Sequence, residues 1–206
     1  MGIMEYKEAL KEAQNEVLRK IGRNVILFQR LEQLLKRIVA EGKISGCATE
    51  LKILQAKRTA IINKQTMGLL VGQYIEQSNP GCKEEYPSAP EELKDAFISF
   101  GFQTECDSFY YENKKKSLAR MVSERNELIH NNLQPDFAST ISCEELGNKL
   151  DDQSENILCE IKELETKLTT LNELKKLMVN FIKSEEGKKF LFGETNKMSK
   201  ILRLIS

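Results

Sequence analysis

The sequence predicts an all-α protein, a bundle of four to five long helices with one short extended segment. Three observations carry this prediction. The composition, with 30% charged and 40% apolar residues, 4 prolines and no tryptophan in 206 residues, is typical of helical proteins. Apolar residues recur at helical spacing through 24–41 and 51–77. In the last third they recur every seven residues, at Leu150, Ile157, Leu164, Leu171 and Met178.

The first half of the chain predicts three helices. Residues 4–20 form a charged helix with a thin apolar stripe, and Gly22 either interrupts this helix or lies within it. Residues 24–41 carry a wide apolar face that includes Phe28, Leu31, Leu35 and Ile38. Gly42 and Gly46 end this helix, and a third helix is expected over 51–77.

One stretch departs from the helical pattern. Ile98, Phe100, Phe102 and Thr104 alternate with small or polar residues, a period of two that predicts a strand. The sequence shows no second strand for it. The segment therefore either lies extended across the bundle or pairs with its own copy in a dimer.

Two more helices follow, over 107–131 and from Cys143 to about 183. The second carries the heptad pattern, and it either closes the bundle or forms a coiled coil. We therefore expect three parts: an N-terminal helix over 1–20 that packs on the core, a helical bundle over 21–184, and a C-terminal tail over 185–206.

Charge and cysteine content exclude several functions. The formal net charge is zero, whereas proteins that coat nucleic acid non-specifically are usually basic. The five cysteines form no C-x-x-C pair, and a single histidine rules out a Cys/His zinc site, so we expect reduced thiols in a cytoplasmic protein. Without an apolar run of 18 residues, no membrane span is expected.

The chemistry-bearing residues gather in the helix over 107–131. Leu118, Val122, Arg125 and Ile129 step along one stripe of this helix, so that an arginine shares an otherwise apolar stripe. A guanidinium there needs an anion, a partner chain or a path to water. Asn126 and His130 are four residues apart on the neighbouring face. Arginine, amide and imidazole therefore converge at one helix end.

Arg125-Asn126-Glu127-Leu128-Ile129-His130 resembles the Arg-polar-x-x-x-His motif of HEPN domains. These are small helical bundles, many of them metal-independent ribonucleases, with the motif toward the end of the penultimate core helix. The resemblance covers about 24–183. It implies an HEPN-like bundle in which Arg125, Asn126 and His130 are catalytic. It also implies an RNA substrate, no metal or cofactor, and a homodimer with both motifs facing one cleft.

Such an enzyme cleaves RNA by attack of the ribose 2′-hydroxyl on the adjacent phosphate. Imidazole can serve as proton acceptor or donor near neutral pH, and a guanidinium can span two phosphate oxygens. Asn126 could orient either group. Substrate contacts are expected from Lys114, Lys115, Lys116, Arg120 and Tyr111, with weaker supporting roles for Gln29 and Glu32.

The same residues allow a purely structural interpretation. A histidine in a last helical turn often complements the helix dipole, and an arginine on an apolar stripe often pairs with a carboxylate of the next helix. Two functions therefore stay open. The chain is a toxin or defence endoribonuclease with a neutralising antitoxin as a partner, or it is a non-catalytic helical adaptor or antitoxin-like interaction protein. Only the enzyme needs Arg125 and His130 for RNA cleavage.

Overall fold

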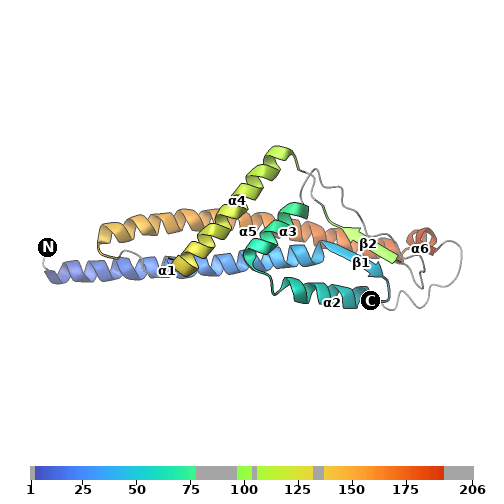
Figure 1. The fold of residues 1–206 in the computed structure, drawn as a ribbon, viewed down its shortest axis with the longest axis horizontal. Helices are drawn as coiled ribbons and strands as arrows, with labels where there is room; N and C mark the ends of the chain where they lie inside the picture. Colours follow the sequence, from blue (N-terminus) through green and yellow to red (C-terminus); the bar gives the residue numbers. More distant parts are fainter. Residues whose placement is uncertain (1–2, 78–96, 104–105, 132–136, 193–206) are drawn as a thin grey trace. The chain divides into compact units, whose positions relative to one another are not determined.

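The computed structural model describes residues 3–77, 97–103, 106–131 and 137–192, and these form helices with one small sheet (Figure 1). The predicted all-α class is confirmed. Contacts divide the chain into two units. The first unit comprises 1–34 and 115–164, and the second comprises 35–114 and 165–206. Three of the described helices, α1, α4 and α5, contribute residues to both units.

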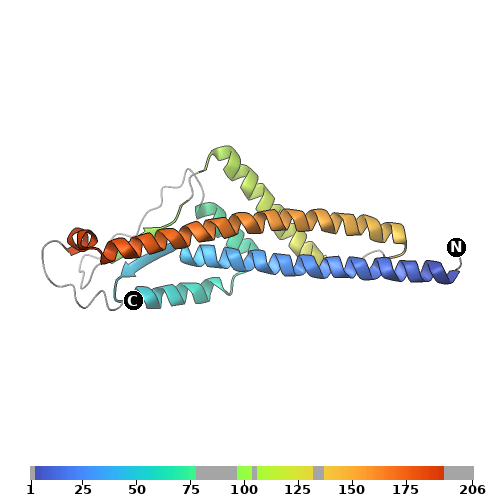
Figure 2. The same cartoon turned by 180° about the vertical axis from the view of Figure 1, so that it is seen from behind.

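In the first unit, the early parts of α1 (Ile3–Glu41) and α5 (Thr140–Lys183) lie side by side (Figures 1 and 2). The two helices run parallel. Lys20 contacts Asp151, and further along both helices Asn24 contacts Gln153. The predicted heptad positions of α5 in this unit, Leu150, Ile157 and Leu164, are buried. Burying each such side chain contributes roughly 1.5–3 kcal/mol, which is why the heptad pattern holds the helix pair together.

A buried asparagine interrupts the matching apolar row of α1. Val17, Asn24 and Leu31 are seven residues apart and fully buried. The Asn24 amide donates to the Leu150 carbonyl oxygen at 2.8 Å and to Gln153 Oε1 at 2.9 Å, and its Oδ1 accepts from Arg23 Nε at 3.0 Å. Because a one-turn slip would leave these groups unpaired, Asn24 fixes the register of the two helices.

Gly22 lies inside α1, so 4–20 and 24–41 form one helix rather than two. Nothing lies within 4 Å of a Cβ built at Gly22, which is exposed. The helix therefore passes through the glycine at a cost of only about 1 kcal/mol relative to alanine.

The second unit contains the sheet. β2 (Phe97–Gly101) confirms the predicted strand, but its partner is β1 (Lys43–Cys47) of the same chain, antiparallel with Ser45 opposite Ser99. Both alternatives for this segment, an unpaired stretch across the bundle and pairing with a second copy, were wrong. Residues 43–47 were assigned to the break after a helix, because a five-residue strand that follows Gly42 and contains Gly46 has no readable alternation. Thr104 lies outside the described residues.

The helix predicted over 51–77 is divided in two, α2 (Leu51–Ile62) and α3 (Met67–Gln77). Ile62 and Met67 are both buried. In one continuous helix they would lie about 140° apart, at five steps of about 100° each, and could not face the same core. The turn at 63–66 reorients the chain so that both side chains are buried.

The rest of the second unit carries the later part of α5 and a short following helix. Leu171 continues the buried heptad row and Leu168 is buried beside it, and Lys175 of α5 donates to Glu41 of α1 at 3.0 Å. Residues 185–192 of the predicted tail form α6 (Glu185–Phe192), while 193–206 lie outside the described residues. No helix in the described ranges is both long enough and apolar enough to cross a membrane.

Candidate functional site

The predicted motif lies at the end of α4 (Ser108–Asn126) and in the π-helical turn η1 (Glu127–Asn131) that continues it. Asp107 caps the start of α4, since its Oδ1 accepts a 2.7 Å hydrogen bond from the Tyr110 backbone N–H. Leu118, Met121 and Leu128 form the buried side of this helix in the first unit. This buried stripe fixes the direction in which the motif residues point.

Arg125 lies on that stripe, between Met121 and Leu128 in the helical repeat, with its side chain 29% exposed. Its Nη2 is 3.8 Å from Oε2 of Glu32 on α1, and its Nη1 donates to Asn126 Oδ1 at 3.1 Å. The guanidinium thus has an anion nearby, as its position on an apolar stripe requires. Glu32, expected to play a supporting role, is the carboxylate that lies next to Arg125, whereas Gln29 is exposed.

A π turn contains the second half of the motif. Arg125 and Asn126 end α4, whereas His130 lies within η1. In a π turn the backbone hydrogen bond spans five residues instead of four, so the helix widens locally. Such π turns occur frequently at functional sites.

His130 and Asn126 are both exposed. No hydrogen bond joins the imidazole to another of the described residues, Arg125 included. The motif therefore presents an accessible imidazole, an accessible amide and a partly accessible guanidinium at one helix end. An acid-base group, a hydrogen-bonding group and a cation are thus available to a ligand.

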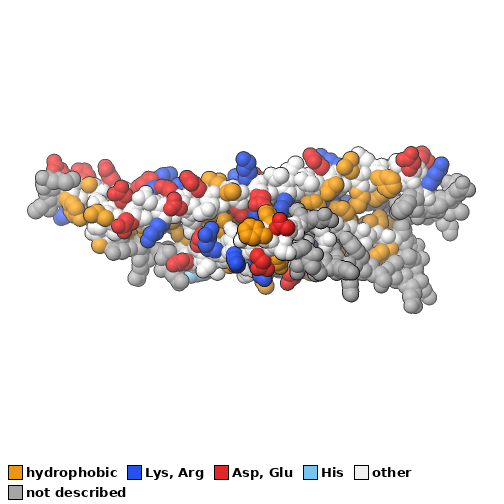
Figure 3. All heavy atoms as spheres, turned by 90° about the horizontal axis from the view of Figure 1, so that it is seen from above, with side chains coloured by type: hydrophobic (Ala, Val, Ile, Leu, Met, Phe, Trp, Pro, Cys, Tyr) orange, Lys and Arg blue, Asp and Glu red, His pale blue; other side chains and the backbone are white. Residues whose placement is uncertain are grey.

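The predicted substrate contacts are divided between exposed and buried positions. Lys115, Lys116 and Arg120 are exposed in the first unit, and Arg120 lies 3.5 Å from Glu124. Lys114 and Tyr111 belong to the second unit, where Lys114 is only 8% exposed and Tyr111 is half-buried. The lysine run therefore offers two accessible ammonium groups and not three. On the face in Figure 3 the two signs of charge are interspersed.

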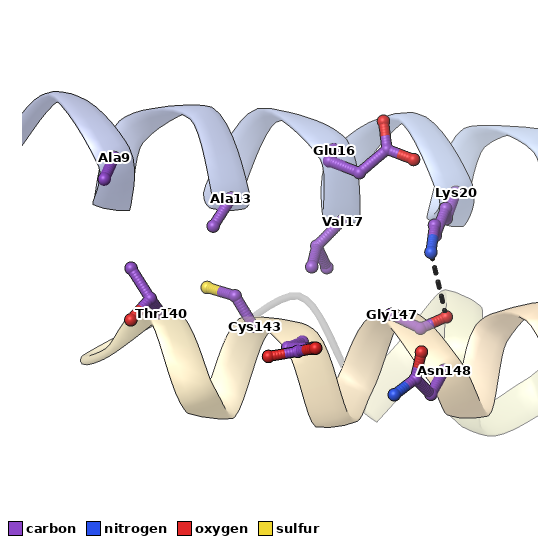
Figure 4. A pocket seen from close by; sticks show the side chains of 10 residues that line it. Ala9, Ala13, Glu16, Val17, Lys20, Thr140, Cys143, Gly147 and Asn148 are labelled. Atoms are coloured by element: carbon purple, nitrogen blue, oxygen red, sulfur yellow. Dashed lines mark hydrogen bonds between the residues drawn. The ribbon is translucent and has the colours of Figure 1, made fainter.

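A cavity in the first unit does not involve the motif. It measures about 360 Å³ and lies between the starts of α1 and α5, where Ala9, Ala13 and Gly147 leave room (Figure 4). The Cys143 thiol and the Val17 side chain point between the two helices. At its edge Lys20 donates to the Gly147 carbonyl at 3.4 Å and to Asp151 at 2.6 Å. The lining is that of a packing gap between helices.

The sequence did not predict two charged features of the structure, the ion pairs of Asp151 and the half-buried Arg58. Lys20 and Arg23 of α1 both bind the Asp151 carboxylate of α5, at 2.6 and 2.9 Å. Hydrogen bonds from Lys20 and then Arg23 lower the pKa of Asp151 below its usual value. A heptad alignment of α1 would have placed these cations beside Asn24, facing the next helix. In the second unit Arg58 is half-buried, and nothing in its helical spacing marks it.

No three His, Cys, Asp or Glu side chains in the described ranges are placed to hold a metal ion. Cys47, Cys106, Cys143 and Cys159 are free thiols, and Cys82 lies outside the described residues. Comparisons of the chain with family models, curated proteins and solved structures found no match. Functional inference therefore starts from the motif and its geometry.

Proposed function

We propose that the chain is a metal-independent endoribonuclease of the HEPN type, acting in the cytoplasm as a toxin or defence effector. The supporting observation is the arrangement at the end of α4. There Asn126 accepts a hydrogen bond from the Arg125 guanidinium, and the exposed His130 lies in the π turn η1 that follows directly. The three motif side chains thus lie at one helix end, and π turns occur frequently at functional sites.

Each motif residue has a role in phosphodiester cleavage. The His130 imidazole accepts the proton of the attacking 2′-hydroxyl or donates one to the leaving 5′-oxygen. Arg125 binds the non-bridging oxygens, on which charge accumulates in the transition state. Asn126 orients the guanidinium through its 3.1 Å bond.

Glu32 is compatible with this role for Arg125. At 3.8 Å the pair is a loose one, and a bidentate phosphate at about 2.8 Å would be the stronger partner. The carboxylate keeps the guanidinium positioned before RNA binds. RNA then replaces Glu32 as the counter-ion of Arg125.

The proposed active form is a homodimer. One chain offers one imidazole, whereas cleavage needs both a proton acceptor and a proton donor. Two motifs facing one cleft would supply both, and the exposure of His130 and Asn126 leaves them accessible to a second copy. Lys115, Lys116 and Arg120 would guide the RNA backbone, and a neutralising antitoxin would cover the same surface.

One observation favours a different function. The Arg125–Glu32 pair joins α4 to α1, as expected if Arg125 serves only to hold a helical adaptor together. In that alternative the chain binds a partner protein and has no activity on RNA.

An RNA-cleavage assay tests the proposal. Wild-type chain in EDTA should cut single-stranded RNA into products with 2′,3′-cyclic phosphate ends, while His130→Ala and Arg125→Ala should not. Cleavage that requires added magnesium would contradict the mechanism. Equal cleavage by wild type and His130→Ala would favour the adaptor.

A further inference from the structure

A second group of polar side chains lies in the second unit, in a cavity between β1 and α2. The cavity measures about 240 Å³ and is lined by Lys43, Ile44, Ser45, Leu54, Gln55 and Arg58. Two of these six residues are cationic and none is acidic. The lining is therefore positive, with hydrogen-bond donors from both the strand and the helix.

Arg58 is held in this cavity by neutral partners. Its Nε donates to the Ala40 carbonyl oxygen at 3.2 Å and its Nη2 to that of Val39 at 3.0 Å, both near the end of α1. These bonds use two of the five guanidinium donors. No carboxylate of the described ranges pairs with Arg58, and burial lowers the pKa of its guanidinium. A half-buried guanidinium with donors remaining is well suited to binding an anion.

Ser45 adds a group with no partner. Its Oγ is buried, and it forms no hydrogen bond with any of the residues that the structure describes. Buried hydroxyls are nearly always hydrogen-bonded, so an unsatisfied one beside a cavity indicates a missing acceptor or donor. Gln55 donates its amide to the Ala40 carbonyl at 3.0 Å, which holds its side chain in the same cavity wall.

We propose that this cavity binds a phosphate oxyanion. Arg58 would supply a fork of N–H donors, Lys43 a second positive charge and Ser45 a hydroxyl donor, a set suited to a tetrahedral dianion. The cavity is smaller than the roughly 300–1,000 Å³ typical of whole-ligand pockets. It therefore accommodates free phosphate, or the phosphate group of a nucleotide whose base remains outside. This site does not depend on the proposed ribonuclease function.

Titration calorimetry of the full-length chain with inorganic phosphate, at constant ionic strength, tests the proposal. We expect saturable binding that weakens about ten- to a hundredfold in Arg58→Gln, the range for losing a hydrogen bond to a charged group. Ser45→Ala should weaken binding about tenfold. Since the Ser45 hydroxyl has no partner, this variant should melt at or above the wild-type temperature, which separates binding from folding.

Lys57→Gln is the matched control, because Lys57 is exposed on the same helix and does not line the cavity. It should bind phosphate within about twofold of wild type, as expected for a screened surface charge. Titration with AMP separates the two sources: tighter Arg58-dependent binding of AMP indicates a nucleotide, and equal binding indicates the free anion. The proposal fails if wild type shows no saturable binding of either, if Ser45→Ala binds as well as wild type, or if Lys57→Gln loses as much as Arg58→Gln.

Discussion

Arg125 is the residue on which the two interpretations of this chain differ most. Removing one member of a fully buried ion pair costs about 3–5 kcal/mol, whereas exposed pairs contribute about 0–1 kcal/mol. The Arg125 and Glu32 side chains are 29% and 19% exposed, and their charged atoms are 3.8 Å apart. Because of this partial exposure and long distance, we expect the pair to contribute nearer about 0–1 than about 3–5 kcal/mol. The guanidinium is therefore available for a ligand.

We therefore predict that Arg125→Ala and His130→Ala reduce RNA cleavage about a hundred- to ten-thousandfold, the usual effect of losing an acid-base group or a charge clamp. Both variants should stay folded. Arg125→Ala should lose about 1 kcal/mol and His130→Ala roughly 0.3–1 kcal/mol, the size of a dipole interaction. Cleavage rates and thermal melts, measured on the same preparations, check this.

Glu32→Gln is the control for the ion pair. If Glu32 only positions Arg125 before RNA binds, this variant should still cleave RNA. A large drop in melting temperature for Arg125→Ala, with normal cleavage by His130→Ala, would instead assign the pair to the scaffold.

A second residue-scale prediction concerns Asp151. Lys20 and Arg23 lower the pKa of Asp151 in the folded chain. Its contribution to stability is therefore fully present above the pKa of the unfolded chain, about 3.9, and is lost as the pH falls through the lower pKa of the folded chain. Asp151→Asn should remove this pH dependence below about pH 4. Acid-unfolding curves measure it, with the exposed neighbour Asp152→Asn as the control, whose curve should follow that of wild type.

At the scale of elements, the α1–α5 pair in the first unit depends on Asn24. The asparagine is fully buried, and all three of its polar bonds reach described groups on the two helices. A polar residue at a single heptad position typically specifies register at some cost in stability.

Asn24→Ala should lower the free energy of unfolding by about 1–3 kcal/mol, because it leaves the Gln153 side chain without its partner and opens a small space. Asn24→Leu should recover most of this loss but weaken the register. Urea unfolding measures the first effect. Cross-linking between cysteines introduced at exposed positions 16 and 148 would report the change in register. Identical cross-linking with Asn24 and with Asn24→Leu would show that the register does not depend on the amide.

At the scale of the whole molecule, the net charge of zero and the single histidine limit how the chain can act on RNA. RNA contact must come from a local group of cations, and a pair of imidazoles must come from two chains. The composite site therefore predicts a homodimer. Light scattering at micromolar concentration should give twice the 23.6 kDa chain mass. A monomer that still cleaves RNA would rule out the two-histidine mechanism while leaving the motif itself essential.

The sequence alone determined the elements whose signals are local. The heptad row from Leu150 to Leu171 predicted α5, because a helical period depends on residues within a few positions of one another. The motif at a helix end was predicted for the same reason. The π turn was not predicted, because Glu127 to Asn131 have the composition of an ordinary helix end.

Tertiary structure decided what depends on residues far apart in the chain. Residues 43–47 become a strand only because 97–101 pair with them, and the 51–77 helix breaks because Ile62 and Met67 must reach one core. The partner of Arg125 is Glu32, 93 positions earlier, and Arg58 meets carbonyls of a different helix. Local spacing cannot encode these contacts, since each forms only when packing brings two separate elements together.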